Sequence, residues 1–184
     1  MALTPSNSME KGVPAPNFEL IDTISDKVVS LSDIKGKKGT VIMFICNHCP
    51  FVLHINEALV RLANDYQSRG IGFVAISSND VVNYPQDGPD KMKLHAMNVG
   101  YSFPYLYDET QEAAKAYDAA CTPDLYAFDS NLTSVYHGQL DHSRPGNGIP
   151  VTGKDMRAVL DCLLSNILYT GDEKPSMGCN IKWK

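Results

Sequence analysis

The stretch Val41-Ile42-Met43-Phe44-Ile45-Cys46-Asn47-His48-Cys49-Pro50 decides the fold of this chain. Its first five residues are apolar, which is typical of a strand that other elements cover on both faces. Two cysteines follow at once with two residues between them, and Pro50 suits the first position of a helix. A helix N-terminus carries partial positive charge from its unpaired N–H groups, which lowers the pKa of a nearby thiol. Because the thiolate is the form that attacks disulfides and peroxides, the stretch predicts a redox site.

The residues after Pro50 predict a helix and a second strand. Apolar side chains recur at spacings of three and four on one face of this helix, and they are Val52, Ile55, Leu59, Leu62 and Tyr66. Gly70 ends the helix, and the apolar run from Ile71 to Ile76 predicts a second buried strand. The three elements form a β-α-β unit whose crossover we expect to be right-handed.

Short strands and helices are expected on both sides of this unit. In chain order the patterns predict a hairpin from residues 18–20 and 27–31, a loop over 77–89, a helix over 89–99, a strand over 103–107, a capping box over 108–111, a helix over 111–119, a hairpin from 125–128 and 134–138, and a last helix capped by Thr152 with Met156, Val159, Leu160, Leu163 and Ile167 facing the core. No repeat or change of composition marks a second domain. We expect an extended lead-in over residues 1–17, one domain over residues 18–169, and a tail over residues 170–184 packed on or near that domain.

Length and composition exclude several classes of protein. The chain has 184 residues, 43% of them hydrophobic, which is enough for the core of one domain. Its net charge of -5 and pI of about 5.4 argue against nucleic acid or an anionic membrane surface as a partner. No apolar run approaches the ~20 residues that span a bilayer, and the N-terminus has no pattern of a secretory signal. Five cysteines in a chain of this size favour a cytoplasmic protein with a working thiol pair over a disulfide scaffold.

Residues 12–20 together with residues 29–33 (Val-Ser-Leu-Ser-Asp) are similar to the opening of the redoxin branch, which includes the peroxiredoxins. Five further motifs are similar to a narrower group, and they are residues 46–52 (Cys-Asn-His-Cys-Pro-Phe-Val), residues 103–106 (Phe-Pro-Tyr-Leu), residues 121–124 (Cys-Thr-Pro-Asp), residues 143–147 (Ser-Arg-Pro-Gly-Asn) and residues 178–183 (Gly-Cys-Asn-Ile-Lys-Trp). With them the chain resembles the peroxiredoxin-like group of AhpC/TSA-type redoxins. The resemblance covers nearly the whole chain. It implies an α/β protein with a thioredoxin-like (glutaredoxin-type) fold, a three-layer α/β/α sandwich with a mixed central sheet and an N-terminal hairpin extension.

The chain departs from the peroxiredoxin pattern at one point. Peroxiredoxins carry P-x-x-x-[TS]-x-x-C before the cysteine that reacts with peroxide. Counting back from Cys49 gives Ile42 and Cys46, and counting back from Cys46 gives Gly39 and Met43. Thiol–disulfide exchange is therefore the simpler inference than peroxidase activity.

The C-x-x-C pair carries the expected chemistry. Cys46 would attack the substrate and Cys49 would resolve the mixed disulfide, so that a redox-active Cys46–Cys49 disulfide takes the place of any cofactor. The alternative is two small buried residues, since free cysteine often acts as a core hydrophobe. His48 lies between the sulfurs and, if cationic, would favour the thiolate of Cys46. The alternative for His48 is that it is an exposed polar residue of a loop. Pro50 would place the N-terminus of the helix next to the two cysteines.

The resemblance also places residues from elsewhere beside the sulfurs. It implies that the Thr122–Pro123 peptide bond is cis and lies next to the active sulfurs, whereas an ordinary trans proline at the start of a strand is the alternative. Cys121 would then lie close to Cys46, either as an extra resolving thiol or as a buried residue.

Two further residues, Cys179 and Arg144, have two interpretations each, and Cys162 has one. Cys179 in the tail could reach back as a resolving thiol, or it could be packed or free. Arg144, in a loop rich in glycine and proline, could bind an anionic substrate or stabilise a thiolate, or it could be solvated. Cys162 lies in the expected last helix, and we expect it to have a structural role with no part in the redox chemistry.

Three functions compete on this evidence. The first is a thiol–disulfide oxidoreductase, and the second is a thiol peroxidase in which one sulfur forms a sulfenic acid that another resolves. Both need a disulfide or peroxide substrate and a thiol electron donor. The third is a non-enzymatic module in which Cys46, Cys49 and a histidine hold copper or zinc, although these leave a structural zinc site short of four ligands. No metal is therefore assigned, and the oligomeric state stays open.

Overall fold

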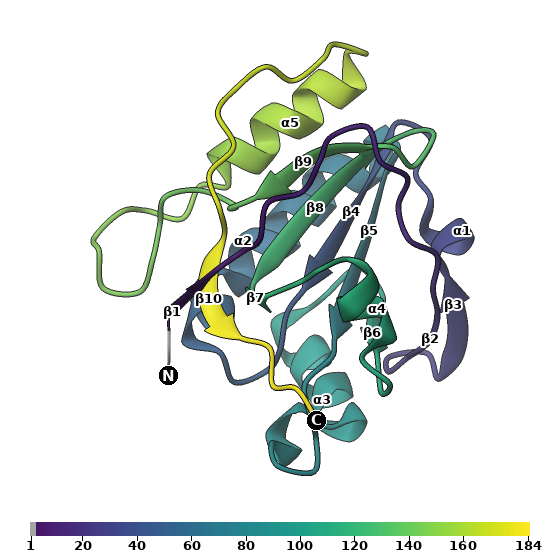
Figure 1. Cartoon of the computed structure of the whole chain (residues 1–184), viewed down its shortest axis with the longest axis vertical. Helices are drawn as coiled ribbons and strands as arrows, with labels where there is room; N and C mark the ends of the chain where they lie inside the picture. Colours follow the sequence, from purple (N-terminus) through teal and green to yellow (C-terminus); the bar gives the residue numbers. More distant parts are fainter. Residues whose placement is uncertain (1–2) are drawn as a thin grey trace.

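A seven-stranded mixed sheet forms the centre of the protein, with strand order β3-β2-β6-β5-β4-β8-β9 (Figure 1). The computed structural model describes residues 3–184. Its strands are β1 (Leu3–Pro5), β2 (Glu19–Asp22), β3 (Lys27–Ser30), β4 (Gly39–Phe44), β5 (Ile71–Ser77), β6 (Tyr105–Tyr107), β7 (Cys121–Thr122), β8 (Asp124–Asp129), β9 (Ser134–Gly138) and β10 (Met177–Asn180). Its α-helices are α1 (Leu31–Ile34), α2 (Pro50–Tyr66), α3 (Pro89–Val99), α4 (Glu112–Ala116) and α5 (Lys154–Leu164). Strands β4, β5 and β6 run parallel, and the other neighbours in this sheet run antiparallel.

Alternate residues of the central strand β4 bury into two separate cores. Val41 and Met43 belong to the core that α2 and α5 cover, while Ile42 and Phe44 belong to the core that α1 and α4 cover. A strand buried on both faces reads as a continuous apolar run, which is why the sequence shows no alternation there. The expected three-layer α/β/α sandwich with a mixed sheet is confirmed.

Helix α2 begins where the proline predicted it. Cys49 is the N-cap, Pro50 is the first helical residue, and all five apolar residues of the predicted face are buried. A short 3₁₀ turn over Gln67–Arg69 follows, and Gly70 ends it with φ of 97°, a conformation that glycine adopts without strain. None of the helices within residues 3–184 is both long and apolar enough to cross a bilayer.

The last helix is shorter than the pattern predicted, and its start is held differently. Helix α5 ends before Ile167, whose side chain is 63% exposed, so its assignment to the core was wrong. Thr152 is not the N-cap, because Gly153 occupies that position with φ of 71°. The buried carboxylate of Asp141 instead accepts hydrogen bonds from the backbone N–H groups of Thr152 and Gly153, both at 2.6 Å. A residue distant in sequence therefore fixes the helix start.

Helix α4 also differs from the prediction at its N-terminus. Gln111 has φ of 64° and caps nothing with its side chain. Its amide donates instead to the carbonyls of Ser78 at 2.7 Å and Lys182 at 2.9 Å. The carboxylate of Asp108 takes the capping role and accepts from the N–H of Ala114 at 3.0 Å. The capping-box prediction was therefore wrong, because Gln111 turns inward to hold the C-terminal tail.

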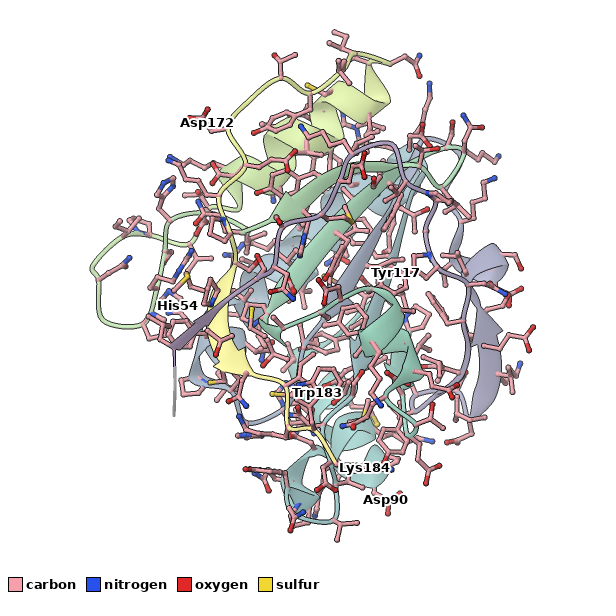
Figure 2. All side chains as sticks on the ribbon, viewed as in Figure 1. His54, Asp90, Tyr117, Asp172, Trp183 and Lys184 are labelled. Carbon is pink, nitrogen blue, oxygen red and sulfur yellow. The ribbon has the colours of Figure 1, made fainter. Side chains whose placement is uncertain are left out.

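The tail contains a strand that the sequence did not reveal. Strand β10 pairs antiparallel with β1 and with β7, forming a second sheet in the order β1-β10-β7. Figure 1 shows this tail beside the N-terminal strand, and Figure 2 shows Trp183 and Lys184 at the lower end of the molecule, where the tail stops. Only four residues form the strand, and two of them are glycine and cysteine, so no periodic pattern marked it.

Gly178 in β10 lies against the Thr122–Pro123 peptide, where there is no space for a side chain. A Cβ atom at position 178 would overlap the carbonyl of Thr122 and lie 3.1 Å from the Pro123 nitrogen. We expect Gly178→Ala to lower the free energy of unfolding by about 1–3 kcal/mol, because backbone atoms must move. Urea denaturation measures the change.

Gly171→Ala provides the matched control. Its Cβ atom would meet only the far end of the Tyr169 side chain, which can rotate away. We expect this variant to stay within about 0.5 kcal/mol of the parent. Equal stabilities for the two variants would show that β10 does not press on the peptide.

Candidate redox site

Both sulfurs of the C-x-x-C pair lie at the carboxyl end of β4 and are buried. Cys46 follows the strand by two residues and is 2% exposed, while Cys49 is the N-cap of α2 and is 0% exposed. A hydrogen bond joins the two side chains, and neither sulfur of the pair is in a disulfide. The structure therefore brings the predicted pair together, and both sulfurs lie beneath the protein surface, largely out of contact with solvent.

Thr122 lies between the two sulfurs and contacts both. Its hydroxyl oxygen is 3.4 Å from Cys46 Sγ, and its carbonyl oxygen is 3.1 Å from Cys49 Sγ. The Thr122–Pro123 peptide bond is cis and lies beside the pair, as the resemblance implied. One residue of β7 thus offers a hydroxyl to one sulfur and a carbonyl to the other.

The acidic sulfur of this arrangement is Cys49 and not Cys46. The hydrogen bond with Cys49 raises the pKa of Cys46 well above its usual range, and burial and the negative charge of Asp87 raise it further. The hydrogen bond from Cys46 lowers the pKa of Cys49 to about 4, helped by hydrogen bonds from the Cys179 thiol and the backbone N–H of Val52. The expectation that position 46 carries the low pKa was wrong, because the resolving sulfur receives more donors.

The same geometry supports a second placement of the shared proton. When Cys49 holds the proton, its S–H can donate to the Thr122 carbonyl. The Thr122 hydroxyl can then donate to a Cys46 thiolate, and this contact lowers the pKa of Cys46. The pair therefore carries one negative charge that can sit on either sulfur after one proton moves.

A buried carboxylate that the sequence did not single out holds the turn between the cysteines. Asp87 is fully buried and accepts the backbone N–H of Asn47 at 2.9 Å and the side-chain amide of Asn79 at 2.8 Å. It also accepts a hydrogen bond from His48 Nδ1 at 2.6 Å. The ring of Tyr84 stacks on the His48 imidazole, with 5.8 Å between the two ring centroids. The loop over residues 77–89 was expected near such a site, but nothing in its pattern distinguished Asp87 from the other polar residues.

This carboxylate changes the role expected of His48. A cationic His48 would be paired with Asp87 at 2.6 Å, so its charge is not free to act on Cys46 alone. The charge of Asp87 itself raises the pKa of Cys46. The two groups together position the turn more than they acidify the first cysteine.

A cluster of possible metal ligands coincides with this turn. One ligand atom each from Cys46, His48 and Asp87 lies within 4.8 Å of the other two. A thiolate, an imidazole and a carboxylate are a donor set that zinc accepts. The same carboxylate also holds the turn between the cysteines, because it accepts from the N–H of Asn47 and from His48 Nδ1.

The remaining cysteines near the pair are placed differently from one another. Cys179 is 3% exposed, and its Sγ lies 3.0 Å from Cys49 Sγ. Burial and the contact with Cys49 raise the pKa of Cys179 to about 12. Cys121 is fully buried and donates to the Pro123 carbonyl at 3.6 Å, and within residues 3–184 no hydrogen bond joins it to another sulfur. Cys162 is partly exposed on α5, away from this group.

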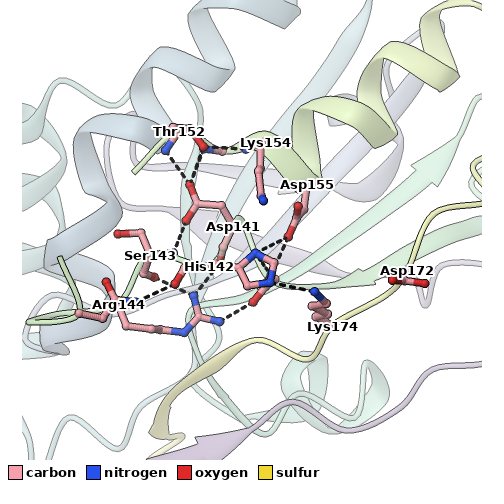
Figure 3. Close-up of polar contacts among 12 residues, drawn as sticks. Asp141, His142, Ser143, Arg144, Thr152, Lys154, Asp155, Asp172 and Lys174 are labelled. Atoms are coloured by element: carbon pink, nitrogen blue, oxygen red, sulfur yellow. Dashed lines mark hydrogen bonds and ion pairs between the residues drawn. The ribbon is translucent and has the colours of Figure 1, made fainter. Parts of the chain in front are cut away.

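Arg144 fastens a loop and does not touch the sulfurs. Figure 3 shows its guanidinium, which donates to the carbonyls of Asp141 at 2.6 Å and Ser143 at 2.7 Å. It also donates to the side-chain oxygen of Gln139 at 2.6 Å. Within the described chain it makes no hydrogen bond to a thiol, although it lines a small pocket next to Pro123. Arg144 therefore shapes the surface beside the site.

Comparison with known proteins shows the family of the chain. The model of the AhpC/TSA family matches residues 12–137, which is more than half of the chain. The chain belongs to the AhpC/TSA family. It is therefore a redoxin, a thioredoxin-fold protein of the group that works through thiol oxidation or reduction.

Solved structures extend the likeness over the full length of this redoxin. An uncharacterized conserved protein from Geobacillus kaustophilus is 59% identical with a TM-score of 0.98, and the match covers 100% of this chain and 97% of that one. A hypothetical protein from Sinorhizobium meliloti 1021 is 44% identical with a TM-score of 0.95, and 98% of each chain is covered. A putative thiol:disulfide interchange protein DsbE from Chlorobium tepidum shares the fold at 19% identity, with a TM-score of 0.65 over 85% of this chain and 99% of that one. The search of curated proteins gave no match.

The low pKa of Cys49 predicts how the reduced redoxin responds to pH. We expect one thiolate per chain at neutral pH, and its ultraviolet absorbance should disappear as the pH falls through about 4. The pKa of Cys49 in the folded protein lies below its ordinary value. This ionisation therefore stabilises the folded protein above the ordinary thiol pKa, and the contribution is lost as the pH falls through the folded-state pKa of about 4.

Cys49→Ser should remove the low-pH transition, whereas Cys162→Ser, the control at a partly exposed thiol, should keep it. Circular dichroism at each pH confirms that the chain stays folded. A reduced protein whose first thiolate appears only near the ordinary thiol pKa would contradict the assignment.

Proposed function

We propose that this redoxin is a thiol–disulfide oxidoreductase in which Cys46 attacks the substrate disulfide and Cys49 resolves the product. The observation that carries the proposal is the hydrogen-bonded sulfur pair beside Thr122 at the N-terminus of α2. We infer from these contacts that the two sulfurs share one proton. A pair that already holds one negative charge needs no external base to produce a nucleophile.

The proposed cycle follows from the two placements of that proton. With the proton on Cys49, the Cys46 thiolate attacks one sulfur of the substrate disulfide, and the other substrate sulfur leaves as a thiolate that takes up a proton. Cys49 then loses its proton, which its lowered pKa favours, and attacks Cys46 Sγ. The Cys46–Cys49 bond forms, the bond from Cys46 to the substrate breaks, and the second substrate thiol departs. A thiol electron donor reduces the internal disulfide and closes the cycle.

Thr122 supports each state of this cycle from one position. Its hydroxyl donates to the Cys46 thiolate before attack, and its carbonyl holds the proton of Cys49 in that same state. When Cys49 becomes the attacking thiolate, the backbone N–H of Val52 stabilises it at the start of α2. No metal or organic cofactor is needed, and a reducing compartment such as the cytoplasm would suit the reaction.

Burial of the sulfurs limits how a substrate can reach them. Cys46 is 2% exposed, whereas the neighbouring Asn47 and His48 are partly exposed. We propose that substrates approach over these two residues, whose side chains must move aside to uncover Cys46 Sγ.

This burial favours a thiol peroxidase as the second candidate, because a peroxide is smaller than a protein disulfide. The Cys46 thiolate would attack the peroxide O–O bond, giving a sulfenic acid at Cys46 and releasing water or an alcohol. Cys49 would then displace the hydroxyl group from that sulfur as water and form the same internal disulfide. Membership of the AhpC/TSA family is compatible with either activity.

Single cysteine substitutions test the primary proposal. We expect Cys46→Ser to reduce insulin disulfides no faster than buffer without protein, because the attacking sulfur is gone. Cys49→Ser should retain the first step and accumulate a mixed disulfide at Cys46 that mass spectrometry detects. Cys162→Ser is the control and should keep the parent rate. A Cys46→Ser protein with the parent rate would reject the proposal.

Peroxide consumption, followed by stopped flow on the reduced protein, separates the two candidates. For an oxidoreductase we expect a rate no faster than that of free cysteine, because the P-x-x-x-[TS]-x-x-C pattern is missing. A rate well above free cysteine, lost in Cys46→Ser and unaccompanied by insulin reduction, would replace the primary proposal with the peroxidase.

A further inference from the structure

Cys179 is in direct contact with the resolving cysteine. Its Sγ lies 3.0 Å from Cys49 Sγ, about 1 Å longer than a disulfide bond of ~2.05 Å. Thiols at this separation need only a small movement to form a covalent bond. Cys121 shows the contrast, because it is equally buried and one strand away but donates to the Pro123 carbonyl instead.

Two rigid features set this contact. Cys179 pairs with Thr122 across the register of β10 and β7, so the cysteine is fixed to the same residue that contacts the C-x-x-C pair. Gly178, the preceding residue, has no side chain, and this lets β10 approach the Thr122 carbonyl closely. The three sulfurs therefore stand in series, with Cys49 hydrogen-bonded to Cys46 on one side and to Cys179 on the other.

We propose that Cys179 is a third redox thiol that exchanges with the Cys46–Cys49 disulfide to give a Cys49–Cys179 disulfide and a free Cys46. This inference rests on the proposed function, since the disulfide or peroxide substrate supplies the oxidation of the first pair. In the exchange, the Cys179 thiol loses its proton and attacks Cys49 Sγ. The Cys49–Cys179 bond forms, the Cys46–Cys49 bond breaks, and Cys46 leaves with the electron pair and takes up the proton. The number of disulfides stays the same, and no further oxidant is consumed.

The electrostatic surroundings of Cys179 change in the direction that this exchange needs. In the reduced protein burial raises the pKa of Cys179, and the hydrogen bond to Cys49 and the charge on Cys49 raise it further. Oxidation of Cys49 to a disulfide removes that charge, while the nearby ammonium of Lys182 continues to lower the pKa of Cys179. Cys179 thus becomes more acidic only after the first disulfide has formed.

The exchange would also lock the C-terminal tail to the site. The tail is held noncovalently, since the N–H of Lys182 donates to Asn79 and the N–H of Asp80 donates to the Lys182 carbonyl. A Cys49–Cys179 bond would add a covalent link between β10 and the first turn of α2. The oxidised protein would then carry a fastened tail and a regenerated Cys46 thiol.

Disulfide mapping of the full chain tests the exchange. The parent, Cys46→Ser, Cys179→Ser and the control Cys121→Ser are oxidised with diamide, digested without reduction and analysed by mass spectrometry. We expect Cys46→Ser to lose two of its four remaining thiols and to yield the peptide pair joined through Cys49 and Cys179, starting from five cysteines in the parent. Cys121→Ser should behave as the parent, which should show both the Cys46–Cys49 and the Cys49–Cys179 pairs.

The outcomes separate this inference from the proposed function. If Cys46→Ser keeps all its thiols, or pairs Cys49 with Cys121, and the parent yields only Cys46–Cys49, the third thiol is rejected and the oxidoreductase stands. If the parent yields Cys49–Cys179 but never Cys46–Cys49, the exchange is rejected together with the two-cysteine cycle. The parent measurement does not depend on any variant, so a variant that fails to fold leaves the test intact.

Discussion

The pairing of β7 with β10 is the constraint on which the site depends. It places Thr122 opposite Cys179, and it does so because Gly178 lets the two backbones approach closely. Thr122 then reaches Cys46 with its hydroxyl and Cys49 with its carbonyl. Thr122, one residue of a two-residue strand, therefore contacts Cys46 and Cys49 and pairs with Cys179.

A second constraint decides where the negative charge lies. The buried carboxylate of Asp87 fixes the turn between the cysteines through the N–H of Asn47 and the ring of His48. The same charge opposes ionisation of Cys46, so the group that shapes the turn also moves the thiolate toward Cys49. At Cys46 the carboxylate that holds the turn also raises the pKa of the thiol. At Cys49 the start of α2 holds the residue and also lowers the pKa of its thiol through the N–H of Val52.

The sequence predicted the parts of this site that are local and left out those that depend on distant contacts. The buried strand, Pro50 and the spacing of the two cysteines are features of one continuous segment, so their placement could be inferred from propensity and periodicity. Asp87 became part of the site only through tertiary packing, because Asn47, its partner in the turn between the cysteines, lies 40 residues earlier in the chain. The identity of the acidic sulfur followed from the direction of the hydrogen bond between Cys46 and Cys49, with further donors on α2 and β10, and no motif encodes these contacts. Strand β10 was missed because four residues that include glycine and cysteine have no pattern of their own, and it forms only where β1 and β7 offer their edges.

Burial of all three sulfurs agrees with a reaction in which only one of them meets the substrate. Cys46 lies beside the partly exposed Asn47 and His48, while Cys49 is buried at the N-cap of α2 and Cys179 is buried in β10. Sulfurs that are shielded from solvent react with their neighbours in preference to external thiols, because the neighbours are already in contact. An oxidising equivalent that enters at Cys46 can therefore move inward along the contacts from Cys46 to Cys49 and from Cys49 to Cys179. Because β10 carries Cys179 and also pairs with Thr122, a change in the position of the tail would alter the second transfer directly and the first through Thr122.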